Sequence, residues 1–310
     1  MDISYDELDY QNLLACARAT RPSTSRNGKT RQLSFASLEF AMSDENSMID
    51  GNLQKILPLL TLKRVPWRTV LTELVWFLRG EDTIQYLTDH NVHIWDGNTT
   101  REFLDSRGLN DYPPGKAGPV YGVQWKKQLP HIIDQLRADP YSRRHIVNSW
   151  QICDLDAMAL PPCHYTFQFV VRDEVSDEVS DENTQPPRKF LDVVVNMRSA
   201  DLPLGVPFNI ASYSLLTHII AAAVGMTAGV LYLAMTNCHI YEEHMEAVNT
   251  MIAREPRHFP TMRFTDNFSA DLAVPMTGDE LCARLSTMTS ADILVEGYDP
   301  HPTVARKRVV

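Results

Sequence analysis

Residues 208–224 form an almost entirely apolar stretch that is interrupted only by small polar side chains. A helix that is apolar on every side has to be surrounded by other elements, so this stretch predicts a helix at the centre of a folded domain. The chain is long and apolar enough to surround such a helix, because 310 residues with 44% hydrophobic side chains bury a large core without metal ions or disulfides. The longest uninterrupted apolar run, near residues 219–224, is too short to span a bilayer.

Other periodic segments predict what packs around this helix. Residues 65–79 follow an early proline with one apolar helical stripe, made of Val70, Leu71, Leu74, Val75 and Leu78. Residues 167–171 and 190–196 are rich in aromatic and β-branched side chains, which is typical of strands. No internal repeat and no long linker divides these elements, so we expect one α/β (α+β) domain over residues 1–310.

Three segments are expected to lie outside the core. Residues 172–187 repeat Glu-Val-Ser-Asp and end in Pro-Pro, which predicts an acidic surface insertion near residues 172–189, a hairpin extension without a catalytic role. The first 25 residues and the polar segment 43–51 are interpreted as further surface excursions.

The charge and the cysteines limit the class of protein. A net charge of -10 disfavours a protein that coats nucleic acid, because such surfaces carry an excess of basic side chains. The five cysteines are odd in number and include no Cys-x-x-Cys pair, which indicates reduced thiols. The N-terminus is acidic and has no apolar secretory segment. We therefore expect a cytoplasmic protein without a membrane segment.

The segment Ala-Leu-Pro-Pro-Cys-His at residues 159–164 presents a candidate nucleophile. Cys163 stands between a Pro-Pro turn and an apolar strand, and strand alternation directs His164 away from it, so the two residues are not a self-contained dyad. A thiolate then needs a nearby cation, for which Arg198 is the candidate. The alternative for a lone cysteine is a small buried apolar residue.

Two other segments offer groups that suit a phosphorylated heterocycle. Arg143 and Arg144 precede an apolar segment, and paired guanidinium groups suit a phosphate dianion, although an exposed pair or a salt bridge is the alternative. Asn209 lies in the buried run, where its carboxamide needs a specific partner. An asparagine matches the N3-H and O4 edge of uracil, whereas an aspartate would favour cytosine. A helix-capping role is the alternative for Asn209.

Glu73 and the pair His239 and Tyr241 complete the candidates. Glu73 interrupts the apolar helix 65–79, so burial would raise the pKa of its carboxyl and suit a proton shuttle; the alternatives are a solvated position or an ion pair with Arg79. In an extended segment His239 and Tyr241 lie on one face, where they would hold a ribose or a phosphate. His239 and His244 do not have helical metal-ligand spacing, so we expect no metal site.

These features together resemble the thymidylate synthase family from about Arg26 to Val310. The segments that carry the resemblance stand in family order: Leu62-Lys-Arg-Val, Glu73-Leu-Val-Trp-Phe, Ile94-Trp-Asp, Gly118-Pro-Val-Tyr-Gly-Val-Gln-Trp125, Met158-Ala-Leu-Pro-Pro-Cys-His164, Gly205-Val-Pro-Phe-Asn-Ile-Ala-Ser-Tyr213, His239-Ile-Tyr241 and Glu296-Gly-Tyr-Asp-Pro-His-Pro302.

The resemblance implies a fold, an assembly and a reaction. The fold would be a mixed sheet covered by helices, in a homodimer that shares Arg143 and Arg144 across its interface. The substrates would be dUMP and 5,10-methylenetetrahydrofolate as cosubstrate, with no metal and no nucleic acid required. Cys163 would add to C6 of the uracil and make C5 a carbon nucleophile toward the methylene carbon of the folate.

The resemblance also implies roles for individual residues. The catalytic residues would be Cys163, Glu73, Asn209, Tyr121, His164, Asp201 and Arg198. The dUMP ligands would be Arg26, Arg143, Arg144, Arg198, Ser199, Asp201, Asn209, His239 and Tyr241. The folate site would consist of Ile94, Trp95, Asn98, Asp201, Leu204, Gly205, Phe208 and the chain end at Val310, which would close over it.

Several departures from the family pattern leave alternatives open. Met197 stands where most synthases have glutamine and makes this segment more similar to nucleotide hydroxymethylases, in which water takes the place of hydride; dUMP 5-hydroxymethylation is therefore the alternative activity. Asn237 replaces an aspartate, Ala200 replaces a smaller or thiol-bearing residue, and a longer loop leaves Arg26 and Arg31 as rival phosphate ligands. A non-enzymatic scaffold that binds RNA or protein is disfavoured by the acidic charge and the intact nucleophile motif.

Overall fold

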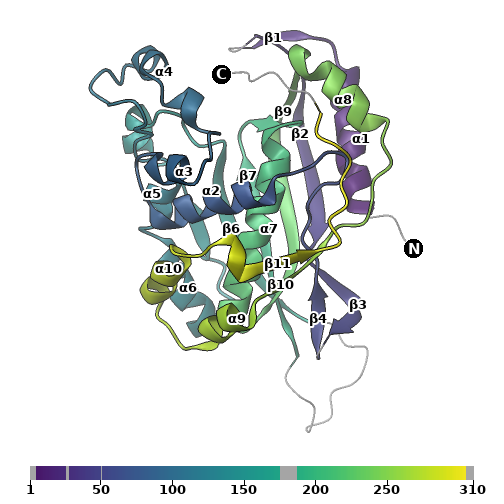
Figure 1. The fold of residues 1–310 in the computed structure, drawn as a ribbon, viewed down its shortest axis with the longest axis vertical. Helices are drawn as coiled ribbons and strands as arrows, with labels where there is room; N and C mark the ends of the chain where they lie inside the picture. Colours follow the sequence, from purple (N-terminus) through teal and green to yellow (C-terminus); the bar gives the residue numbers. More distant parts are fainter. Residues whose placement is uncertain (1–4, 26–27, 50, 175–186, 305–310) are drawn as a thin grey trace.

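The computed structural model describes residues 5–25, 28–49, 51–174 and 187–304 (Figure 1). Its main sheet has seven strands in the order β1-β2-β9-β7-β6-β5, with β8 also paired to β9. The strands are β1 (Ser23–Ser25), β2 (Gly28–Ala41), β5 (Ile146–Asn148), β6 (His164–Asp173), β7 (Lys189–Met197), β8 (Ala200–Asp201) and β9 (Thr227–Tyr241). Because β9 is parallel to β7 and β8 but antiparallel to β2, the sheet is mixed, as predicted.

The apolar stretch forms the central helix α7 (Gly205–Ala223), which begins three residues earlier than the sequence pattern indicated. It packs against β7, β9 and α2 (Trp67–Arg79) and joins the main hydrophobic core. By length and composition α7 is apolar enough to cross a membrane, but 78% of its most apolar window is buried inside the protein. That degree of burial is expected of the core helix of a globular domain.

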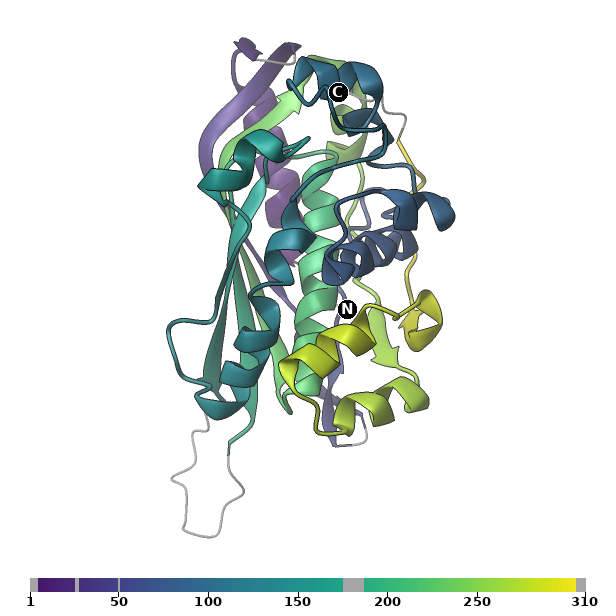
Figure 2. The same cartoon turned by 90° about the vertical axis from the view of Figure 1, so that its left-hand side faces the viewer.

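The helix predicted over residues 65–79 is α2, which ends at Gly80 in the left-handed conformation that glycine adopts without strain. The other helices after it are α3 (Gln85–Asp89), α4 (Arg101–Ser106), α5 (Tyr121–Trp125), α6 (Leu129–Ala138), α8 (Met245–Ile252), α9 (Asp266–Ala273) and α10 (Gly278–Leu285), with short 3-10 turns η1 (Asp96–Asn98), η2 (Ile152–Ala157), η3 (Glu242–His244) and η4 (Ser290–Asp292). In Figure 2 the helices gather on the side of the sheet that α7 occupies.

The opposite side of the sheet carries apolar side chains that are open to solvent. Phe35 of β2, Ile146 of β5 and Val170 of β6 are 62%, 45% and 40% exposed. Val170 alternates with the fully buried Phe169, and Ile146 alternates with the fully buried Val147, so the exposed members point away from α7. One face of the sheet therefore builds the core, and the other presents these three apolar side chains to solvent among polar ones.

The N-terminal segment corrects the sequence interpretation. Instead of a surface excursion, residues from Tyr5 onward form α1 (Tyr5–Ala19), which packs against β2 and α8 and buries Tyr10 and Leu14 completely. The polar residue that hid this packing is Glu7, which is also fully buried. Its carboxylate accepts hydrogen bonds from the backbone N–H groups of Thr61 (2.6 Å) and Leu62 (2.9 Å), so a charged side chain is satisfied inside the core.

Two other predicted excursions have different outcomes. Residues 43–51 belong largely to a separate hairpin, β3 (Ser43–Ile49) with β4 (Asn52–Lys55); a second small sheet pairs β10 (Thr261–Phe264) with β11 (Ile293–Glu296). The pairing of β6 with β7 continues to Asp173 opposite Lys189, which confirms both predicted strands. Residues 175–186 of the acidic tract lie outside the described residues, so a hairpin there stays a prediction.

Candidate active site

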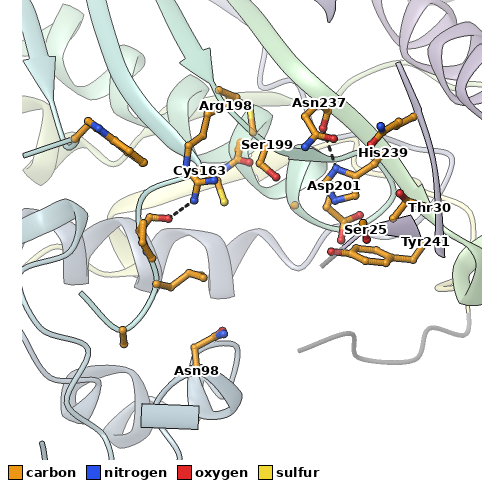
Figure 3. A pocket seen from close by; sticks show the side chains of 18 of the residues that line it. Ser25, Thr30, Asn98, Cys163, Arg198, Ser199, Asp201, Asn237, His239 and Tyr241 are labelled. Atoms are coloured by element: carbon orange, nitrogen blue, oxygen red, sulfur yellow. Dashed lines mark hydrogen bonds between the residues drawn. The ribbon is translucent and has the colours of Figure 1, made fainter. Parts of the chain in front are cut away.

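A cavity of about 560 Å³ opens at the end of the sheet, with Cys163 and Arg198 on one side of it and His239 on the other (Figure 3). This volume lies within the range of small-molecule sites. Its walls come from β1, β2, β8, β9 and α7 and from the segments around α4 and Cys163, and they comprise Ser25, Thr30, Gln32, Asn98, Phe103, Arg107, Trp150, Ala159, Leu160, Pro161, Cys163, Met197, Arg198, Ser199, Asp201, Gly205, Asn209, Asn237, His239 and Tyr241.

The backbone of Cys163 is held from two sides directly before β6. Its N–H donates to the hydroxyl oxygen of Tyr121 at 2.7 Å, and its carbonyl accepts the N–H of Arg198 at 2.9 Å. The side chain is half-buried and lines the cavity. Cys163 is thus an accessible and positioned thiol, and the alternative of a buried apolar residue is wrong.

Arg198 extends along the Pro-Pro turn beside this thiol. Its Nε donates to the carbonyl of Pro162 at 2.8 Å and its Nη2 to the carbonyl of Pro161 at 2.7 Å, while the guanidinium lies 5.2 Å from the ring centroid of Trp150. Because these bonds leave other guanidinium N–H groups unused, Arg198 can both stabilise a thiolate and receive an anion. The cation that the sequence predicted for Cys163 does line the same cavity.

His164 points to the other side of the segment, as strand alternation predicted. Its ring stacks on Tyr121 with centroids 4.1 Å apart, and its Nδ1 lies 2.8 Å from the hydroxyl of Tyr213. Burial lowers the pKa of His164 to about 3, so the imidazole is neutral at physiological pH. Burial also raises the pKa of Tyr121 and Tyr213 well above the ordinary value, so these hydroxyls stay protonated.

Glu73 lies on α2 and accepts the indole N–H of Trp95 at 2.7 Å. Burial raises the pKa of its carboxyl from 4.5 to about 7, against the opposing effect of this hydrogen bond. The proposed ion pair with Arg79 is wrong, because Arg79 pairs with Glu81 at 2.6 Å. A carboxyl that titrates near neutral pH has the property that a proton shuttle requires.

Asp201 introduces a carboxylate among three basic side chains. Burial raises the pKa of its carboxyl, whereas the charges of His239, His244 and Lys63 act to lower it. Its Oδ1 accepts the N–H of Leu204 at 3.2 Å, which fixes it at the start of α7. Asp201 can therefore accept a hydrogen bond from a ligand in the cavity.

Asn209, His239 and Tyr241 also face the cavity. Asn209 is half-buried within α7, whose N-cap is Leu204, so the capping alternative for Asn209 is wrong. His239 and Tyr241 project from one face of β9, as predicted, with their rings edge to face at 5.1 Å. His239 Nδ1 lies 2.8 Å from the carbonyl of Asn237, a residue in the left-handed conformation with φ 50°. These contacts orient the imidazole edge toward a ligand.

The structure brings together nine of the residues predicted for the site. Those that line the cavity are Asn98, Cys163, Arg198, Ser199, Asp201, Gly205, Asn209, His239 and Tyr241. Those that lie outside its lining are Glu73, Ile94, Trp95, Tyr121, Arg143, Arg144, His164, Leu204 and Phe208. Arg26 and Val310 lie outside the described residues. Arg31 pairs with Glu242 at 2.8 Å and donates to two backbone carbonyls, and the choice between Arg26 and Arg31 as loop ligand stays open.

Sequence reasoning missed part of the cavity wall. Thr30 and Gln32 could have been found, because alternate positions of a strand share a face and both are polar. Trp150 and Arg107 carried no periodic signal, since neither lies within a helix or a strand. Among the described residues no cluster of His, Cys, Asp and Glu could hold a metal ion, and none of the five cysteines, all of which are described, forms a disulfide.

Comparisons with known proteins point to one family. A family model described as thymidylate synthase matches residues 18–310. A thymidylate synthase of Agaricus bisporus is 35% identical over 99% of this chain and 100% of its own length, and that of Saccharomyces cerevisiae is 34% identical over 94% and 91%. A probable thymidylate synthase of Schizosaccharomyces pombe is 40% identical over 82% of this chain. The chain spans 40% of that last protein and 47% of a bifunctional dihydrofolate reductase-thymidylate synthase of Leishmania major.

Proposed function

The chain belongs to the thymidylate synthase family, and we propose that it converts dUMP to dTMP with 5,10-methylenetetrahydrofolate as carbon donor and reductant. The observation that carries the proposal is the single cavity in which Cys163, Arg198 and Asn209 meet. A nucleophile, a cation and a carboxamide correspond to the reacting carbon, the phosphate and the base edge of a uridine nucleotide.

Cys163 begins the reaction by adding its thiolate to C6 of the uracil. The new S–C6 bond moves an electron pair to C5 and O4, and C5 then forms a bond to the methylene carbon that the folate supplies. Loss of the C5 proton breaks the bond between the methylene carbon and the folate nitrogen, so tetrahydrofolate departs with that electron pair and an exocyclic methylene is left on C5. A hydride from tetrahydrofolate then adds to the methylene carbon, the C5=C6 double bond re-forms and the thiolate leaves C6, which gives dTMP, dihydrofolate and free Cys163. Division of one difficult substitution into addition and elimination steps is the purpose of a covalent nucleophile.

The remaining polar residues hold the nucleotide. Asn209 donates to O4 and accepts from N3-H, which selects uracil. Arg198 and Ser199 bind the phosphate from one side, with Arg26 or Arg31 as the loop ligand. His239 and Tyr241 bind the deoxyribose hydroxyl from β9. Each assignment uses a donor or acceptor that a nucleotide can satisfy.

Glu73 is the proton-transfer group of the proposal. Its carboxyl has a pKa of about 7, so both protonation states are populated at physiological pH. Because Glu73 does not line the cavity, we infer that ordered water connects it to O4 and to the folate, with Asn209, Tyr121 and His164 in the same polar network. Neutral His164 keeps a second positive charge away from the thiolate.

The folate is assigned to the part of the cavity beside Asn98, Asp201 and Gly205. Asp201 accepts from the pterin, and the nearby apolar residues Ile94, Trp95, Leu204 and Phe208 pack against its rings. Closure by the segment that ends at Val310 would exclude water while the methylene group awaits hydride. Exclusion of water is the step that separates methylation from the hydroxymethylase alternative, which the synthase names of the relatives do not favour.

We also propose a homodimer in which the open face of the sheet is covered by a second copy. Support comes from the exposed apolar residues Phe35, Ile146 and Val170 on that face. Arg143 and Arg144 are exposed and do not line the cavity of their own chain, so they are free to complete the phosphate site of the partner. A cytoplasmic location, suggested by the free thiols, is part of the same proposal.

The activity is tested by adding dUMP and methylenetetrahydrofolate to the purified protein and following dihydrofolate by absorbance. The proposal expects dihydrofolate with the wild type and none with Cys163→Ala. The shared site is tested by mixing the inactive variants Cys163→Ala and Arg144→Gln after unfolding and refolding. Regained activity supports sites built from two chains, because one site of each mixed dimer then has both residues intact; no regain contradicts the dimer proposal.

A further inference from the structure

Arg107 is a cation of the cavity to which no role has yet been assigned. It caps the C-terminus of α4, and its side chain lines the same cavity as Cys163 and Arg198. Its Nε is buried and has no hydrogen-bond partner among the residues that the structure describes. A buried donor on a charged group is costly when it is unsatisfied, so a ligand that supplies the acceptor would relieve it.

The position of Arg107 is set by a small core of its own. Leu104 and Leu109, on either side of it in the sequence, pack with Ala159 in a hydrophobic cluster that is separate from the main core. Tyr112 packs on this cluster and donates its hydroxyl to the carbonyl of Ala157 at 3.0 Å. Because Ala159 is itself part of the cavity wall, this cluster attaches the end of α4 to the segment that leads to Cys163.

Two neighbouring charges pair with each other. Asp105 forms an ion pair with Arg101 at 2.8 Å, and Arg101 also donates to the carbonyls of Leu109 and Tyr112. Within the described part of the chain the Nε of Arg101 lacks a partner as well, but Arg101 uses its terminal nitrogens on protein oxygens and does not line the cavity. Of Arg101 and Arg107, it is therefore Arg107 whose side chain faces the cavity.

The charge of the cavity points to an anion. Among its lining residues Asp201 is the one carboxylate, and it is surrounded by His239, His244 and Lys63. Arg107 and Arg198 are left as two guanidinium groups in a partly apolar cavity, where charge-assisted hydrogen bonds are strong. Figure 3 shows Asn98, from the chain segment just before α4, separated from the sheet residues across the cavity.

We propose that Arg107 is a substrate-binding residue that donates from Nε and a terminal nitrogen to an anionic oxygen of a substrate. Two substrates of the proposed reaction carry such oxygens, the phosphate of dUMP and the carboxylates of the folate. The inference rests on the proposed function for the identity of the ligand, whereas the cavity and the unpartnered guanidinium stand independently of it. It gives α4 and its small core a functional purpose, which is to place this cation.

The test compares the wild type with Arg107→Met, which keeps the length and apolar packing of the stem, and with Arg107→Lys, which keeps the charge but loses the planar fork. Arg263→Gln is the matched control, because Arg263 is exposed on β10 and makes a surface ion pair with Glu296. Calorimetric titrations use dUMP, then the folate added to the dUMP complex, and separately inorganic phosphate. Thermal melts without ligand check the fold.

The proposal expects the Arg107→Met substitution to weaken the binding of dUMP or of the folate by on the order of 10- to 100-fold. The melting temperature without ligand should be unchanged or higher. Weaker dUMP and phosphate binding assigns the phosphate, and a change restricted to the folate assigns a carboxylate. Affinities within about twofold of wild type for all three ligands would overturn the proposal, as would equal losses accompanied by a lower melting temperature. If the wild type bound phosphate but neither dUMP nor the folate, the proposed function would be refuted. The role of Arg107 as an anion ligand would still be tested, by comparing the phosphate affinity of Arg107→Met with that of the wild type.

Discussion

Glu73→Gln is expected to stabilise the protein at alkaline pH while it removes activity. The glutamine keeps an oxygen that can accept the indole N–H of Trp95, now 2.7 Å from the carboxylate, but it cannot ionise. In the wild type the carboxyl has a pKa of about 7 in the folded protein, against 4.5 as its ordinary value. Between these values the folded state binds more protons than the unfolded state, so the stability that Glu73 contributes is lost as the pH rises through about 7.

The magnitude follows from the same two values. The interval from 4.5 to about 7, at about 1.4 kcal/mol per pH unit, corresponds to roughly 3 kcal/mol of instability when Glu73 is charged. About a quarter of it is present at pH 5 and nearly all at pH 8. The gain in unfolding free energy of the glutamine variant over wild type should therefore grow by about 2 to 3 kcal/mol between these pH values. Buried Glu7, whose pKa is also raised to about 7, is common to both proteins and cancels.

The assay is urea unfolding of both proteins at pH 5 and pH 8, at one protein concentration because a dimer would make stability concentration-dependent. Glu255→Gln is the control, since this carboxylate is exposed just after α8 and its removal should give no comparable trend. Turnover of the Glu73→Gln variant should fall by roughly 10²- to 10⁴-fold, the usual contribution of a proton-transfer group. A stability difference that does not change with pH, or a variant that is less stable than wild type at pH 8, would refute the reasoning.

Four other changes test separate parts of the structure. Asn209→Asp should shift the preference from dUMP toward dCMP, because a protonated carboxyl and an amide present different edges to the base; an unchanged ratio of kcat/KM for the two nucleotides would contradict the role of Asn209. His164→Gln should make the stability of the protein less dependent on acid pH. The pKa of His164 in the folded protein, about 3, lies below its ordinary value of 6.5, so the stability that the neutral imidazole contributes is lost as the pH falls below 6.5. A variant whose melting temperature falls between pH 7 and pH 4 as steeply as that of the wild type would contradict this. Gly122→Ala should lower the unfolding free energy in urea by about 1 to 3 kcal/mol or more, because the added Cβ would lie 2.3 Å from the carbonyl oxygen of Phe77; wild-type stability would show that α2 and α5 can separate. Deletion of residues 173–187 should leave the Kd for dUMP within about twofold, because β6 and β7 join this tract at Asp173 and Lys189, about nine residues or roughly 30 Å of strand from the Cys163 end; a large loss would assign the tract a binding role.

The parts of the fold that sequence predicts well are those with a strong period. The α2 stripe and the all-round apolar α7 were placed within three residues, because burial of these side chains in a core follows directly from their spacing. The helix α1 was missed because its pattern includes Glu7, a residue that reads as solvent-exposed. The backbone N–H groups of Thr61 and Leu62 satisfy its carboxylate, and they lie more than fifty residues away in the chain, where local sequence cannot reveal them.

The site divides in the same way. His239 and Tyr241 could be predicted because side chains alternate along a strand. Cys163 and Asn209 could be predicted because each is an unusual residue type for its place, the first after a Pro-Pro turn and the second within an apolar stretch. The ion pair of Arg31 could not be predicted, since its partner, Glu242, lies more than two hundred residues away in the chain. Arg107 was invisible for a similar reason, because only the folded chain brings the end of α4 beside Ala159.

The central claim is that the methylene carbon is reduced by hydride and is not captured by water. The most direct measurement is the mass of the nucleotide product after incubation with dUMP and methylenetetrahydrofolate, with dihydrofolate quantified in the same sample. Our account predicts dTMP and dihydrofolate in equal amounts. A 5-hydroxymethyl nucleotide formed without dihydrofolate would contradict it, and would show that water reaches the intermediate in the cavity beside Met197.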